Sequence, residues 1–63
     1  MEIKGLHVAI VHRRFALGGA EEVSRQTACL FSALGIHTHF FAETHIETEW
    51  TLPDDPLIDL CLL

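Results

Sequence analysis

Two neighbouring stretches, LHVAIV at residues 6–11 and GGAE at residues 18–21, decide how this sequence folds. The first stretch is short, rich in β-branched residues and apolar apart from His7, which predicts a strand buried on both faces of a parallel sheet. The second stretch opens a helix that we expect to run to about Leu34. A strand followed by a glycine pair and a helix is the layout of a phosphate-binding turn, because the first backbone N–H groups of the helix can meet an anion.

The helix is expected to bury one stripe of apolar or neutral side chains at a spacing of 3.6 residues. Gly35 follows the last residue of that pattern and is a natural helix stop. Glu21 and Arg25 are four residues apart and away from the stripe, in the order that favours an ion pair. The predicted stripe consists of Ala20, Val23, Thr27, Leu30, Phe31 and Leu34.

The remaining segments complete an α/β pattern. Residues 12–17 are expected to form a connecting loop, and residues 36–42 a second strand, parallel to the first because the helix supplies a crossover. Residues 43–56 are polar and acidic and predict a long loop with a turn at PDDP, residues 53–56. Residues 57–63 predict a third strand. The sequence thus predicts one Rossmann-like parallel sheet over residues 1–63, incomplete, in the order strand–helix–strand–loop–strand.

Composition narrows the class of protein. Hydrophobic residues make up 49% and charged residues 21% of the 63 positions, which favours a packed interior over disorder. The net charge of −5 and the four Lys and Arg residues argue against nucleic acid as a partner. No apolar run approaches the roughly 18 residues of a membrane span. The N-terminal MEIKG does not resemble a signal peptide, so a cytoplasmic location is expected.

Two further features bear on stability and completeness. Cys29 and Cys61 do not make a disulfide framework, and we expect both to be reduced and buried. The chain ends on an apolar run, residues 57–63, which needs cover. We therefore expect this chain to be the front piece of a longer protein, and marginally stable alone.

Charged and polar residues near the glycine turn are candidate ligand contacts. The turn lacks the three glycines of a dinucleotide fingerprint and the Lys of a P-loop, so two glycines that only ease a tight turn remain an alternative. Arg13 and Arg14 follow the first strand, where α/β folds bind ligands, and either can neutralise a phosphate or stay solvated. His12 can donate to a substrate hydroxyl or bond to backbone or water instead.

The segment HRRFALGGAE at residues 12–21, together with LGIHTHFF at residues 34–41, resembles the N-terminal end of the family 4 (group 1) glycosyltransferases, which have the two-domain GT-B fold. The resemblance covers roughly residues 6–42. It implies that Gly18 and Gly19 line the cleft between the two domains and bind substrate, and Arg14 is our third candidate there. Glu22 departs from the family, which often has Arg at that position. The family's donor-binding basic pair and carboxylates belong to a second domain.

The resemblance implies a function for a fuller protein. It would transfer a hexosyl unit from a nucleotide-sugar donor to a glycan or lipid-linked acceptor, with retention of anomeric configuration. Parts of the protein outside this stretch could make peripheral contact with a membrane. This stretch carries no catalytic residue that we can assign, and no cofactor is expected; the 63-residue piece would be inactive. The alternative is a non-catalytic α/β remnant or partner subunit that binds no sugar nucleotide.

Histidines and acidic residues supply the last candidates. His37 and His39 fall on one face of the second strand. A third ligand from His45, Glu43 or Glu47 would make a metal site, but the spacing is generic and no metal is predicted. His7 is expected to be a hydrogen-bonded core residue.

Trp50 is expected to cover the sheet edge, with stacking on a sugar as the alternative. The acidic side chains are expected to be solvated rather than paired for acid–base work. They are Glu43, Glu47, Glu49, Asp54, Asp55 and Asp59.

Overall fold

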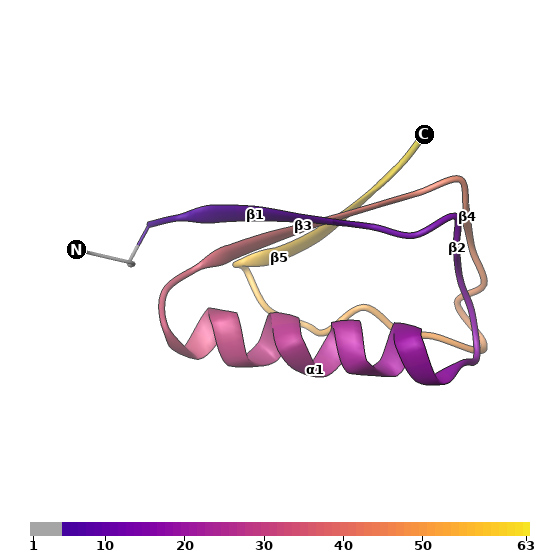
Figure 1. Cartoon of the computed structure of the whole chain (residues 1–63), viewed down its shortest axis with the longest axis horizontal. Coiled ribbons are helices and arrows are strands. Elements are labelled where there is room, and N and C mark those ends of the chain that lie inside the picture. The colour runs from indigo at the N-terminus through magenta and orange to yellow at the C-terminus, as the bar shows by residue number, and fades with distance from the viewer. Residues whose placement is uncertain (1–4) are drawn as a thin grey trace.

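The computed structural model of the chain describes residues 5–63, which form two parallel sheets and one helix (Figure 1). The N-terminal residues 1–4, on which the signal-peptide argument depends, lie outside the described residues. The structure confirms an α/β fold with a three-stranded parallel sheet and one helix. In chain order the elements are β1 (His7–Val11), β2 (Arg14–Phe15), α1 (Gly19–Ala33), β3 (His37–Ala42), β4 (Thr44–His45) and β5 (Ile58–Leu62).

The main sheet has the order β1-β3-β5, with both pairs of strands parallel. Helix α1 connects β1 to β3 and lies along one face of this sheet (Figure 1). The segment between β4 and β5 returns beside the helix on the same side of the sheet (Figure 1). The carboxyl ends of the strands and the N-terminus of α1 therefore lie at the same end of the molecule.

The expectation that the first strand is buried on both faces is wrong. Burial alternates along β1, with His7, Ala9 and Val11 exposed and the two residues between them half-buried. The reason is that α1 covers only one face of the sheet within residues 5–63, so alternate side chains of the strand point away from the core.

The core is an aromatic cluster between the helix and the carboxyl end of the sheet. Phe15 and Phe40 are completely buried, and their rings meet edge to face with centroids 5.1 Å apart. Trp50 is 4% exposed and packs against both rings, at 4.5 Å from Phe15 and 5.3 Å from Phe40. Ala28, Ala42 and Ile58 complete the cluster. Trp50 thus packs in the core against the central strand β3, rather than covering the sheet edge as expected.

Helix α1 begins and ends close to the predicted positions. The amide of Ile36 bonds to the carbonyl of Phe31 and the amide of Gly35 to that of Ser32, which is a Schellman motif. Gly35 has φ 79°, a left-handed conformation that a side chain would disfavour. The glycine stop predicted at this position is confirmed.

The predicted apolar stripe of α1 is partly wrong. Val23 and Leu30 are each 62% exposed and Leu34 is 47% exposed. Ala28 is the buried residue of the helix, and its small side chain lets the backbone of α1 approach the sheet closely. Val23, Leu30 and Leu34 therefore lie on the outer side of the helix within the described part of the chain, whereas Phe31 is half-buried.

Two other expectations need correction. The predicted loop over residues 12–17 contains β2, which pairs in parallel with β4 and carries the buried Phe15. Cys29 and Cys61 are reduced, as expected, but both are exposed. Within residues 5–63, no helix is long and apolar enough to cross a membrane.

Candidate functional site

The glycine turn exposes backbone amides at the start of α1. Gly18 is the N-cap residue, with an extended backbone (φ 175°, ψ 158°) that any residue could adopt, so its glycine is not required by conformation. Among the hydrogen bonds of residues 5–63, none uses the amides of Gly19 or Ala20 as donors. A Cβ atom at Gly19 would meet no heavy atom within 4 Å. The turn therefore presents open N–H groups at the positive end of the helix dipole.

Two carboxylates of the chain lie beside these amides. Oε2 of Glu21 lies 2.5 Å from the position that a Cβ of Gly18 would occupy, so this glycine makes room for the glutamate. Oε1 of Glu49 accepts a hydrogen bond from the amide of Leu17 at 3.1 Å. The negative charge of the Glu21 carboxylate opposes binding of an anion at the turn, because like charges repel. No pocket is present at the turn or elsewhere in the described residues.

The basic residues near the turn are exposed. Nε of Arg13 lies 3.4 Å from Oε2 of Glu43, with 89% and 63% of the two side chains exposed, so the pair contributes little to stability. Arg14 is exposed on β2. Arg25 donates to the carbonyl oxygen of Thr51 at 2.8 Å, in place of the ion pair with Glu21 that the helical spacing predicted.

The structure assigns structural partners to two other candidates. Nε2 of His12 lies 2.8 Å from Oγ of Ser24, whose hydroxyl donates to the Ala20 carbonyl, so His12 is the donor in this contact. Nε2 of His45 donates to the carbonyl oxygen of Trp50 at 2.7 Å. With Trp50 buried in the core, its ring is not placed to stack on a sugar.

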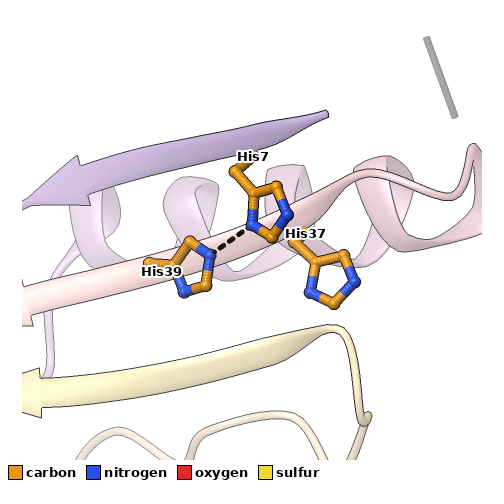
Figure 2. A group of neighbouring side chains, drawn as sticks. All are labelled: His7, His37 and His39. Atoms are coloured by element: carbon orange, nitrogen blue, oxygen red, sulfur yellow. Dashed lines mark hydrogen bonds between the residues drawn. The ribbon is translucent and has the colours of Figure 1, made fainter. Parts of the chain in front are cut away.

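A cluster of three histidines lies on the sheet face that α1 leaves open. The parallel register puts His7 directly beside His37, and His39 follows two residues later on the same face of β3 (Figure 2). One nitrogen from each of the three rings lies within 4.8 Å of the other two. His7 is exposed, so the prediction of a core position is wrong, although the predicted hydrogen bond exists. The third histidine beside His37 and His39 is therefore His7.

Hydrogen bonds order this cluster. Nδ1 of His39 lies 2.8 Å from Oδ1 of Asp59, its register partner on β5. Because a carboxylate only accepts hydrogen bonds, Nδ1 of His39 carries the proton in this contact. Nε2 of His39 lies 2.8 Å from Nδ1 of His7 and accepts its hydrogen (Figure 2). Asp59 thus fixes the tautomer and orientation of the His39 ring.

Asp55 is another acidic residue that has specific partners instead of only solvent. Its Oδ2 accepts a hydrogen bond from Oγ of Ser32 at the end of α1, and its Oδ1 accepts one from the amide of Leu57 at 2.8 Å. The bond from Ser32, and then that from Leu57, lower the pKa of Asp55 below its ordinary value; desolvation opposes them, and the nearby His37 ring adds a smaller lowering. This carboxylate connects the turn at residues 53–56 to the helix.

We expect the stability of the chain to fall with acidification through Asp55. Its pKa is lower in the folded than in the unfolded state, so the stabilisation is present above about pH 4 and is lost as pH falls through the folded pKa. Urea unfolding measured from pH 7 to pH 2 should show a smaller acid-dependent loss for Asp55→Asn than for the unmodified chain. Asp54→Asn, at an exposed neighbour, is the control and should leave the loss unchanged. Equal acid dependence of Asp55→Asn and the unmodified chain would contradict the assignment.

The structure thus brings the predicted residues into two separate places. Gly18, Gly19 and Arg14 lie at the carboxyl end of the sheet, whereas the histidines lie at the amino ends of β1 and β3. No protein-family model, curated protein or solved structure matches this chain.

Proposed function

We propose that this chain is the first part of a Rossmann-like domain in a nucleotide-sugar-dependent glycosyltransferase of the GT-B fold. The observation that carries the proposal is the set of unbonded amides at Gly19 and Ala20, at the carboxyl end of a parallel sheet. In open α/β sheets, ligands bind outside the carboxyl ends of the strands. The position fits a diphosphate, which helix N-termini favour.

The strand order supports the same proposal. The order β1-β3-β5 matches one half of a doubly wound sheet, in which three successive strands lie side by side and the first is the innermost. A second half would add its strand beside β1, the outer edge here. The glycine turn follows β1 and would then lie at the point where the strand order reverses, which is the ligand site of such folds.

The amides of the turn and the nearby arginine would have different roles in binding the donor. Backbone amides at Gly18 and Gly19 would approach phosphate oxygens of the donor, and Arg14 would neutralise their charge. The chain by itself would not catalyse transfer, because the resemblance places the donor-binding basic pair and carboxylates in a second domain. The acceptor would be a glycan or a lipid-linked sugar.

The alternative is a non-catalytic α/β unit that binds no sugar nucleotide. Two carboxylates beside the turn favour this alternative. Glu49 already accepts the hydrogen bond of the Leu17 amide, and Glu21 occupies space beside Gly18 that an anion would use. The coding sequence beyond Leu63 separates the two proposals. A second Rossmann-like half supports the transferase, and a stop codon at this position supports the alternative.

Substituting Gly19→Val in the protein that carries both halves of the cleft tests the proposal directly. The new side chain enters open space, so the fold should be retained while the amides are shielded from an anion. We expect the rate of sugar transfer to fall by about 100-fold. Removing one hydrogen-bond donor that stabilises the charge developing in a transition state has an effect of this size. Ala33→Val adds the same kind of volume at the exposed far end of α1 and should leave transfer unchanged. Unchanged turnover in Gly19→Val would remove the turn from the mechanism.

A further inference from the structure

We propose that His7, His37 and His39 form a binding site for a zinc ion, with Asp59 holding the His39 ring from outside the ligand set. The three imidazoles converge on the open face of the sheet from two neighbouring strands (Figure 2). Three histidines with a fourth position left for water are an established ligand set for zinc. The site is independent of the glycine turn, which lies at the opposite end of the strands.

The distances between ring nitrogens are close to those that zinc requires. Tetrahedral zinc with Zn–N bonds of about 2.0–2.1 Å separates its ligand nitrogens by about 3.3 Å. Nδ1 of His7 and Nε2 of His39 are 2.8 Å apart and would separate by about 0.5 Å on binding. One ring nitrogen of His37 lies within 4.8 Å of a nitrogen of each of the other two rings, and would move inward by at most about 1.5 Å. Rotation of exposed or half-buried side chains supplies such movements without a change of backbone.

The hydrogen bonds already select a metal-ready form of His39. The Asp59 carboxylate accepts the Nδ1 proton, which leaves the lone pair of Nε2 directed toward the cluster. Such a carboxylate–histidine pair orients the ring and makes it a stronger ligand in zinc sites. His7 at present donates its Nδ1 proton to His39, and ligation through that atom requires the proton to move to its own Nε2. This exchange between neutral tautomers occurs through solvent.

The backbone supplies rigidity to the site. Two ligands lie two residues apart on β3, the central strand, and the third is the register partner of the first on β1. The hydrogen-bonded pairing of β1 with β3 therefore fixes the relative positions of the three Cα atoms. The face on which they lie is not covered by α1 (Figure 1), and the three side chains are exposed or half-buried, so an ion and its water can reach the rings.

Titration of the 63-residue chain with Zn²⁺, in competition with a chromophoric chelator, tests the proposal. We expect one ion per chain. Replacing any one of the three ligands by glutamine should lower the affinity for zinc by more than about 100-fold, which exceeds the effect of losing a residue that only hydrogen-bonds to a ligand. The variants are His7→Gln, His37→Gln and His39→Gln. Asp59→Asn should lower it by about 10-fold to 100-fold. His12→Gln, at the other end of the sheet, and the exposed Cys29→Ser and Cys61→Ser are controls that should retain it.

Two spectroscopic readouts keep the test decisive if a variant unfolds, which circular dichroism would reveal. In the unmodified chain, Zn²⁺ should shift the imidazole ¹⁵N resonances of the three ligands at one equivalent and leave those of His12 and His45 in place. Co²⁺ in place of zinc should give visible d–d absorption without a thiolate charge-transfer band. Unshifted ligand resonances, a thiolate band, or affinity unaffected by His7→Gln would each overturn the proposal.

Discussion

Replacing Trp50 by alanine is expected to remove much of the free energy of unfolding of the chain. The side chain is 4% exposed, and its ring packs against both Phe15 and Phe40. Removing a buried tryptophan costs about 3–5 kcal/mol. Typical stabilities of about 0.05–0.15 kcal/mol per residue give a chain of 63 residues about 3–9 kcal/mol in total. The loss is therefore comparable to the whole free energy of unfolding.

The matched variant Trp50→Phe separates packing from hydrogen bonding. The indole N–H donates to the carbonyl oxygen of Glu21 at 2.9 Å, which ties the loop to the first turn of α1. Phenylalanine keeps an aromatic ring and loses this bond, at a cost of about 1 kcal/mol. Urea unfolding followed by far-ultraviolet circular dichroism should rank the unmodified chain, Trp50→Phe and Trp50→Ala in that order. A Trp50→Ala chain as stable as the unmodified one would contradict the core assigned here.

The elements that could be predicted from sequence are those encoded locally. The β-branched run at residues 6–11, the helix after Gly18 and the glycine at position 35 each carry their own signal, and their places in the structure agree within a residue or two. The third strand at residues 57–63 was readable for the same reason. The two-residue strands β2 and β4 were missed, because so short a pairing depends on contact between segments about 30 positions apart rather than on local pattern.

Side-chain environments were predicted less well, since they depend on what covers each face. An apolar segment such as residues 6–11 is buried on both faces of the sheet only if helices cover both faces. In this structure α1 covers one face. The same reasoning explains the exposed Val23 and Leu30, which lie on the uncovered side of the helix. A spacing of 3.6 residues between apolar side chains predicts a helix. It does not decide which of two neighbouring strips of side chains along that helix packs against the sheet.

The candidate sites show the same division. Open amides at Gly19 follow from the local strand–turn–helix pattern, whereas the Glu49 carboxylate reaches Leu17 from 32 positions away and carried no local signal. The histidine cluster was within reach of sequence reasoning. Aligning the predicted strands 6–11 and 36–42 in parallel puts His7 opposite His37, and only the assumption of a fully buried first strand removed His7 from the candidate ligands.

Replacing Thr38 by valine is expected to stabilise the chain. Thr38 is completely buried in the central strand, between Val8 and Ile58 in the parallel register. Its hydroxyl oxygen has no hydrogen-bond partner within residues 5–63. An unpaired buried hydroxyl costs about 1–3 kcal/mol, and valine has nearly the same shape without it. The free energy of unfolding should therefore rise by about 1 kcal/mol or more.

The exposed Thr44 provides the control for this substitution, because Thr44→Val makes the same chemical change on β4 in contact with solvent. It should alter stability by no more than about 0.5 kcal/mol. Both variants are measured by urea unfolding at pH 7. If Thr38→Val instead destabilises the chain while Thr44→Val does not, the buried Thr38 hydroxyl makes a net favourable contribution and the prediction is wrong.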